Sequence, residues 1–111
     1  MKLNFSYNWN HKLDCNGFTT FRPFNSTIHY TGAHYDIFLN TKEKIFDLGT
    51  AKVITMYKMK LEKVTPAIAL LDTGYSLEEF KKIVTTMYKN RFPDINNVDF
   101  VLLFLQYVLH R

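Results

Sequence analysis

The sequence predicts an α+β fold, built as a strongly curved sheet or small barrel of about five to six strands. Apolar and polar side chains alternate with a period of two in several runs within residues 3–60, as in strands that bury one face. Only residues 76–88 repeat clearly with helical spacing, and an apolar run follows at 100–109. Strands, one main helix and a last strand are typical of α+β domains. A chain of 111 residues supports one core, so we expect a single domain over 1–111.

The first two expected strands are separated by a polar stretch. Residues 3–9 alternate without a break and give the clearest strand pattern, with the apolar side chains Leu3, Phe5, Tyr7 and Trp9. Residues 10–17 are polar, which indicates a loop or a short helical turn. Residues 18–22 return to an extended pattern, and Pro23 ends this strand or places it at the edge of the sheet.

The middle of the chain predicts three further strands. Residues 35–39 alternate, 40–44 form a polar turn, and 45–48 form a short return strand. We expect Gly49 to turn the chain into a longer strand at 51–60. In that strand the odd-numbered residues share one face, and the opposite, half-polar face carries Lys52, Lys58 and Lys60.

Two helices are expected in the second half. Thr65 and Pro66 suit a helix cap and first position, so a shorter helical turn is expected to run to Leu71. Ser76 and Glu79 form a capping box that opens the main helix. Its apolar face consists of Leu77, Phe80, Ile83, Val84, Met87 and Tyr88.

The run 100–109 is apolar on both faces. This pattern is typical of a central strand that is covered on both sides. A buried C-terminal helix is the competing interpretation, because periodicity alone does not separate the two in such a run.

Composition sets limits on the class of protein. Hydrophobic residues make up 47% and aromatic residues 16% of the chain, which excludes a disordered tail and favours strands. The single cysteine, Cys15, excludes an internal disulfide framework, and no signal-like start is visible, so we expect a cytoplasmic protein. The longest apolar run is about half a membrane span, so no membrane partner is expected.

The charge is mildly basic, at +4 with a pI near 9.2, which slightly favours polyanionic partners. The four histidines and Cys15 have no zinc-ligand spacing, and no glycine-rich phosphate loop or nucleophile elbow is present. We therefore expect no metal and no cofactor.

The strand at 18–22 carries the first candidate for function. It places two hydroxyls and a guanidinium among aromatic residues, where polar groups are costly unless they have partners. Thr20 and Arg22 share one face of a strand. A hydroxyl beside a fixed cation is suited to an anion or a nucleotide, although an exposed edge with Arg22 paired to Asp36 or Asp72 is equally compatible with the pattern.

Several short motifs, taken in order along the chain, resemble an ASCH domain of the PUA-like superfamily. They are Trp9-x-x-Lys12-Leu13, Phe18-Thr19-Thr20-Phe21-Arg22, Tyr35-Asp36-Ile37-Phe38-Leu39, Leu48-Gly49-x-Ala51-Lys52-Val53 and Asp72-x-Gly74-Tyr75-Ser76-x-x-Glu79-Phe80. The resemblance covers nearly the whole chain. It implies a small closed β-barrel with flanking helices, a cleft beside the Thr-x-Arg strand, and binding of RNA or a nucleotide-like ligand.

Some members of that family are similar to small amidohydrolases that remove an acyl group from modified cytidine with a lysine, a threonine and a glutamate. Thr20 matches the threonine, but Gly17 stands where the lysine is expected. Lys12 is the nearest earlier lysine, and Asp72 is a near match for the carboxylate, while Thr73 fits its spacing better. A threonine needs an adjacent base to become a nucleophile, so the sequence favours binding over catalysis.

The expected function is therefore binding of RNA or a nucleotide-like ligand, with Thr20 and Arg22 lining the cleft. Trp9, Lys12, Asp72 and Tyr75 are the remaining candidate ligand-binding residues and are expected at its rim. The first alternative is an amidohydrolase acting on acylated pyrimidine nucleosides, in which Lys12 would activate Thr20. The second is a protein-interaction module that uses the lysine-bearing face of residues 52–60. The sequence does not decide the oligomeric state.

Overall fold

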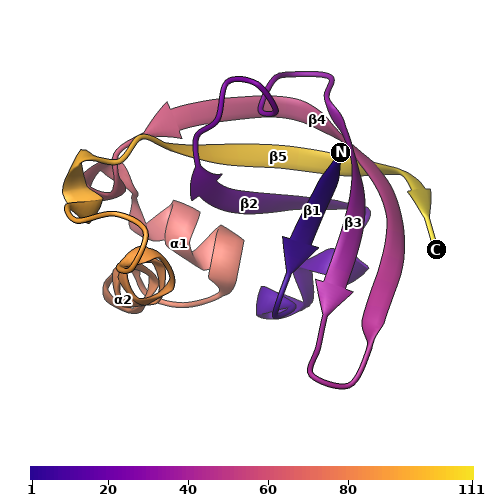
Figure 1. The fold of residues 1–111 in the computed structure, drawn as a ribbon, viewed down its shortest axis with the longest axis horizontal. Coiled ribbons are helices and arrows are strands. Elements are labelled where there is room, and N and C mark those ends of the chain that lie inside the picture. Colours follow the sequence, from indigo (N-terminus) through magenta and orange to yellow (C-terminus); the bar gives the residue numbers. More distant parts are fainter.

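A five-stranded sheet that curls into a half-barrel forms the body of the protein (Figure 1). The computed structural model describes residues 1–111. The sheet has the order β1-β3-β4-β5-β2; β1 runs parallel to β3, and all other neighbours are antiparallel. The strands are β1 Lys2–Phe5, β2 Gly17–Pro23, β3 His34–Asn40, β4 Ile45–Met59 and β5 Phe100–His110.

Two α-helices, α1 at Pro66–Thr73 and α2 at Leu77–Tyr88, pack beside one end of the sheet (Figure 1). Both begin where the sequence predicts: the Thr65 side chain accepts from the Ile68 amide at 3.2 Å, and Ser76 accepts from the Glu79 amide at 3.2 Å. Short 3-10 helices follow β1, β4 and α2; they are η1 Trp9–Asp14, η2 Leu61–Lys63 and η3 Ile95–Asn97. None of the helices has the length and hydrophobicity needed to span a membrane.

The sheet buries both of its faces at β5. One core lies within the curl of the sheet and includes Val101, Leu103 and Leu105. The other lies between the sheet and the helices and includes Phe100 and Leu102 together with Phe80 of α2. Because alternate β5 side chains enter opposite cores, the run is apolar on both faces, and the prediction of a central strand is confirmed over that of a helix.

Three details of the strands differ from the sequence prediction. The first strand ends at Phe5 and not at residue 9, so Trp9 begins η1. Gly49 does not turn the chain; it lies inside β4, where a Cβ atom would collide with the Leu109 backbone of β5. A register shift between Val53 and Thr55 also exchanges the two faces of β4.

The bulge in β4 moves the side chains beyond it to the other face. Met56 packs against the core inside the curl, although its even number placed it on the surface face. Tyr57 is 55% exposed, although its odd number placed it inside. An alternation rule fails after a bulge, because one extra residue reverses every later side chain.

The half-barrel stays open between its two edge strands. β1 and β2 end the sheet order on opposite sides and do not pair with each other. The side chain of Arg22 on β2 crosses this opening and donates to the backbone oxygen of Asn4 on β1 at 2.9 Å. The closed barrel implied by the ASCH resemblance is therefore not formed; an open seam is present, and the candidate site lies beside it.

Candidate functional site

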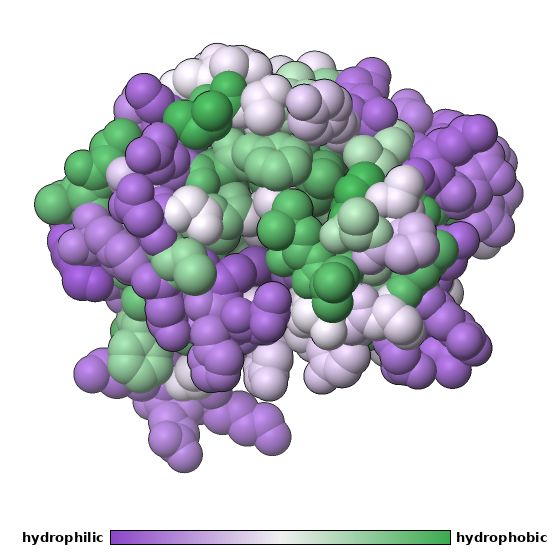
Figure 2. Space-filling view, turned by 180° about the vertical axis from the view of Figure 1, so that it is seen from behind, coloured by the Kyte–Doolittle hydropathy of each residue, from purple (hydrophilic) through white to green (hydrophobic).

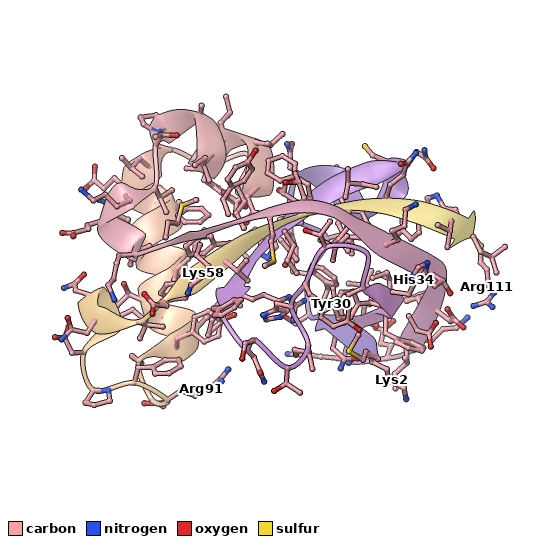
Figure 3. The ribbon with its side chains drawn as sticks, turned by 90° about the horizontal axis from the view of Figure 1, so that it is seen from above. Lys2, Tyr30, His34, Lys58, Arg91 and Arg111 are labelled. Atoms are coloured by element: carbon pink, nitrogen blue, oxygen red, sulfur yellow. The ribbon has the colours of Figure 1, made fainter.

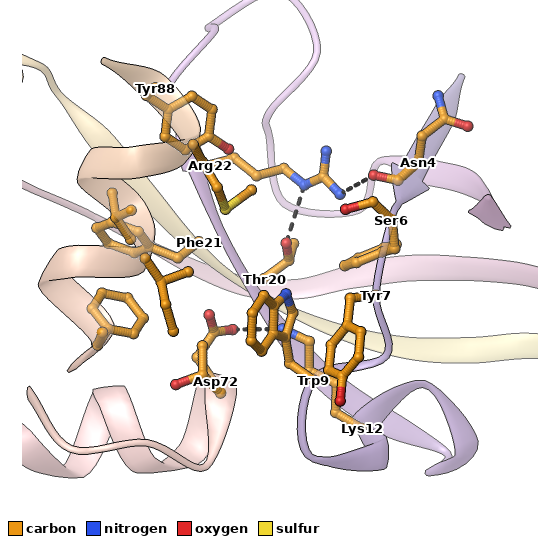
Figure 4. A pocket seen from close by; sticks show the side chains of 16 residues that line it. Asn4, Ser6, Tyr7, Trp9, Lys12, Thr20, Phe21, Arg22, Asp72 and Tyr88 are labelled. Carbon is orange, nitrogen blue, oxygen red and sulfur yellow. Dashed lines mark hydrogen bonds and ion pairs between the residues drawn. The ribbon is translucent and has the colours of Figure 1, made fainter. Parts of the chain in front are cut away.

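A cleft of about 130 Å³ lies beside the seam, between the ends of β1 and β2, the start of η1, the end of α1, and α2 (Figure 4). Five of the six predicted site residues line it: Trp9, Lys12, Thr20, Arg22 and Asp72. Tyr75 does not line the cleft, but its ring contacts the ring of Trp9, which does. Among the other lining residues, sequence reasoning assigned no ligand role to Asn4, Ser6, Tyr7 and Tyr88.

Arg22 is held in a fixed position within the cleft. Its Nε donates to Thr20 Oγ1 at 3.0 Å and its Nη2 to the Asn4 carbonyl at 2.9 Å. Its Cζ lies 4.7 Å from the centre of the Phe5 ring, which adds a cation–π contact. Fixing the planar guanidinium before binding reduces the entropy cost of holding an anion.

No carboxylate neutralises Arg22. It is absent from the ion pairs of the structure, and Asp36 instead accepts from Thr50. Burial lowers the pKa of the Arg22 guanidinium, although an arginine stays protonated in proteins. The alternative in which Arg22 pairs with Asp36 or Asp72 is therefore not formed. Asp72 lines the same cleft but pairs with Lys12, so Arg22 is a partly buried cation without an ion pair.

Asp72 is occupied by other partners. Its Oδ1 accepts from Lys12 Nζ at 2.9 Å and from Thr19 Oγ1 at 2.7 Å. All three residues are buried, with exposures of 7% for Lys12, 4% for Thr19 and 5% for Asp72. Burial lowers the pKa of the Lys12 ammonium, and the charge of Asp72 opposes that shift. These residues form a neutral, hydrogen-bonded cluster, of which Lys12 and Asp72 line the cleft and Thr19 does not.

The hydroxyl beside Asp72 belongs to Thr19, which sequence reasoning passed over in favour of Thr20. Thr20 is on the other face of β2, where its hydroxyl accepts from Arg22. Lys12 therefore bonds to Asp72, and no hydrogen bond joins it to Thr20. The alternation of side chains along β2 could have identified Thr19. It shares a face with Phe21, which packs in the core between the sheet and the helices.

Aromatic side chains form one wall of the cleft. Tyr7 and Trp9 have ring centres 4.6 Å apart, and Trp9 and Tyr75 have ring centres 5.9 Å apart, both edge to face. Tyr7 is 56% exposed, so part of its ring surface remains free for a ligand. Tyr88 lies on the opposite side, next to Arg22 (Figure 4). Burial raises the pKa of the Tyr88 hydroxyl, so that group remains a neutral hydrogen-bond donor.

The wall rests on an unusual backbone in η1. Asn10 and His11 have φ of 56° and 54°, a left-handed conformation that costs about 1–2 kcal/mol per residue for most side chains. Gly74, the C-cap of α1, lies against Asn10, and a Cβ on it would be 3.0 Å from the Asn10 side chain. Packing against α1 therefore supports the strained turn that carries Trp9 and Lys12.

The predicted row of lysines on β4 does not form one surface. Lys60 pairs with Asp99 at 2.9 Å, and Lys58 Nζ lies 4.5 Å from the centre of the Phe24 ring. The register shift between Val53 and Thr55 places Lys52 on the opposite face of β4 from Lys58. Figure 3 also shows Lys58 well separated from Lys2 and Arg111. No group of three histidine, cysteine, aspartate or glutamate side chains is placed to hold a metal ion.

Comparison with known proteins extends the description of the fold. No family model matches the chain, and no curated protein matches it. It is similar to a solved structure, that of protein EF3133 from Enterococcus faecalis V583, which is described under the family model DUF984. The TM-score is 0.65 at 14% identity, over 84% of this chain and 61% of that chain. This chain spans less than two thirds of that protein, and at this identity the likeness concerns the fold alone.

Proposed function

We propose that the protein binds a nucleotide-like anion in the cleft beside the open seam. The observation that carries the proposal is Arg22, a cation held by two hydrogen bonds and a ring contact. It has no ion pair, because Asp72, the carboxylate that lines the same cleft, is bonded to Lys12. An unpaired, partly buried cation is costly, and a bound phosphate or carboxylate would offset that cost with charge-assisted hydrogen bonds. The ASCH resemblance of the sequence supports the same ligand class.

The aromatic wall supports a base as the second part of the ligand. Tyr7 and Trp9 are close enough to Arg22 to share one cleft, and base–aromatic stacking contributes about 1–3 kcal/mol per base. The volume of about 130 Å³ is smaller than the roughly 300–1,000 Å³ of pockets for drug-sized ligands. The cleft therefore suits one phosphate and one base edge, either in a free nucleotide or in one nucleotide of an RNA.

The scattered surface cations favour a short ligand over a long phosphate backbone. A basic stripe is the usual feature of a protein that follows a backbone over several nucleotides. The lysines of β4 are partly engaged by Asp99 and Phe24 and do not provide one. The experiment therefore compares binding of a free mononucleotide with binding of RNA.

The experiment is a titration of AMP, UMP and a short single-stranded RNA across a salt series, with wild type and Arg22→Ala. We expect binding that weakens as salt rises and that drops by about 10- to 100-fold in Arg22→Ala, since hydrogen bonds to a charged group contribute about 1.5–3 kcal/mol. Arg111→Ala is the matched control, because it removes the same charge outside the cleft. Equal affinity in wild type and Arg22→Ala would refute the site.

The buried cluster supports a second candidate, the amidohydrolase of acylated pyrimidine nucleosides. Thr19 Oγ1 donates to the Asp72 carboxylate at 2.7 Å, and that carboxylate can accept the hydroxyl proton when the oxygen attacks the amide carbonyl. The C–N bond then breaks as the amine leaves with this proton, and water hydrolyses the acyl ester on Thr19 to release the acid. Lys12, on the same carboxylate, would stabilise the developing charge. Here Thr19 replaces Thr20 as the nucleophile.

The hydrolase candidate is tested by incubation with N4-acetylcytidine and measurement of released acetate. It requires release by wild type and by Thr20→Ala, and loss of release in Thr19→Ala. Thr20 makes this a matched pair, because the two threonines are neighbours on β2 with equal burial. Absence of acetate release by wild type would end this candidate and leave the binding proposal unchanged.

A further inference from the structure

A second cavity, of about 500 Å³, lies on the helix side of the sheet between the end of α1, η1 and the strands β2, β4 and β5. The helices cover the part of this face near Phe21 and Phe100, and the cavity occupies the part that they leave uncovered. Figure 2 shows hydrophobic residues gathered near the middle of the rear face, with hydrophilic residues around them. The volume falls within the usual range for small-molecule sites, about 300–1,000 Å³.

The surface of this cavity combines apolar and neutral polar groups. Ile54, Leu71 and Phe104 provide apolar area, and Leu71 is 52% exposed and Ile54 46% exposed. The amide side chains that line it, those of Asn10, Asn16 and Gln106, are exposed at its rim and make no side-chain hydrogen bond within the protein, so solvent or a ligand can reach them. Carboxamides pair with the donor and acceptor edges of heterocyclic bases, as glutamine and asparagine do with adenine.

The cavity has no free charge. Lys12 is the only charged side chain that lines it, and its ammonium is bonded to Asp72. A charged ligand would have to compete with that buried pair or lose its own hydration without compensation. The cavity therefore suits an uncharged ligand, in contrast to the cleft with its unpaired Arg22.

Gly17 keeps one side of the cavity open. Its backbone is not in the left-handed region, and a Cβ there would meet only the Leu105 carbonyl, at 3.4 Å. The backbone thus does not require glycine at this position of β2. The absence of a side chain at Gly17 leaves space beside Thr19 and Gln106 that a ligand can fill.

We propose that this second cavity binds a small, uncharged heterocycle of purine or nucleoside size. One face of the ring lies on the apolar surface of Phe104, Leu71 and Ile54, and its polar edge pairs with the free carboxamides. The site shares the Lys12 side chain with the cleft but does not depend on Arg22, so either proposal can fail without the other.

The test is an NMR titration of the ¹⁵N-labelled protein with adenosine as the probe. We expect saturable shifts at the amides of Thr19, Ile54 and Gln106, present in Arg22→Ala and weakened at least about tenfold in Gly17→Leu, which fills the cavity. Adenosine should also slow the reaction of Cys15 with N-ethylmaleimide, because Cys15 lines the cavity and is exposed. Thermal unfolding of Gly17→Leu checks that the variant is folded.

Three results would overturn the proposal. These are the absence of saturable shifts at Thr19, Ile54 and Gln106, shifts that persist unchanged in a folded Gly17→Leu, and shifts that disappear in Arg22→Ala. If Gly17→Leu does not fold, the smaller Gly17→Ala and the protection of Cys15 by adenosine decide the question. An unprotected Cys15 together with unchanged binding in Gly17→Ala would then count against the site.

Discussion

The two cavities share the Lys12 side chain, yet they differ in how charge is arranged around it. In the cleft, Arg22 has hydrogen-bond acceptors but no ion pair, because Asp72 is bonded to Lys12. In the second cavity, the only charge is Lys12, and Asp72 neutralises it. We infer that the pairing of a cation, and not its presence, determines which class of ligand a cavity suits. Lysine and arginine counts in the sequence do not contain that information.

The Lys12–Asp72 pair is the element that separates the two cavities, and its loss should have the largest effect. Asp72→Ala leaves a buried ammonium unpaired, which costs about 3–5 kcal/mol of unfolding free energy. Urea unfolding measures this loss, and Arg111→Ala, which removes the exposed Arg111–Asp47 pair, should cost at most about 1 kcal/mol. The double variant Lys12→Met/Asp72→Leu should recover most of the loss. A change below about 1 kcal/mol in Asp72→Ala would mean that the pair does not form.

Substitutions at two glycines test the backbone of η1, which positions Asn10 and Lys12. Gly74 has φ of 79° and lies against Asn10, so Gly74→Ala should destabilise the protein by about 1–2 kcal/mol. Gly17→Ala introduces no strain, and we expect it to be neutral or to stabilise by less than about 1 kcal/mol. Thermal unfolding of both variants gives the comparison. Equal effects at the two positions would contradict the assignment of strain to the η1–α1 contact.

Tyr107 makes a smaller, pH-dependent contribution to the free energy of unfolding through its contact with η1. Its hydroxyl donates to the Leu13 carbonyl at 3.0 Å and holds η1 on β5, and burial raises its pKa to about 12. Because the folded state holds this proton more tightly than the unfolded chain, the contribution is complete below pH 10 and is lost between pH 10 and 12. Tyr107→Phe should cost about 1 kcal/mol at pH 7 and remove this alkaline loss. If wild type and Tyr107→Phe lose the same stability between pH 10 and 12, groups other than Tyr107 cause the loss.

Much of the architecture follows from local sequence signals. Thr65, Ser76 and the period of residues 76–88 predict both helices, and the two-faced apolar pattern of β5 predicts its central position. Five residues that line the cleft were also expected from the sequence. Thr20 and Arg22 are polar among aromatic residues, and Trp9, Lys12 and Asp72 belong to the motifs that resemble an ASCH domain. These signals depend on residues that are close together in the chain. They predict the structure correctly where the local preference for helix or strand agrees with the overall fold.

The parts that the sequence did not predict depend on contacts between distant segments. The bulge in β4 arises from pairing with β5, so alternation within β4 alone gives the wrong faces. Thr19 acquires its role from Asp72, which lies 53 positions later in the chain. The second cavity exists only because α1 covers part of the sheet and Gly17 adds no side chain. A pattern of neighbouring residues therefore does not predict the bulge, the Thr19–Asp72 hydrogen bond or the second cavity.

The most direct test of the central claim observes the Arg22 guanidinium itself. The NMR signal of Arg22 Nε–H reports its hydrogen bond to Thr20 and the arrival of any anion. We predict that AMP shifts this signal in a saturable way, more weakly as salt rises, and that adenosine, which lacks the phosphate, does not shift it. An Arg22 signal that is unmoved while AMP shifts other resonances saturably would contradict the claim that the cleft binds a nucleotide-like anion through Arg22.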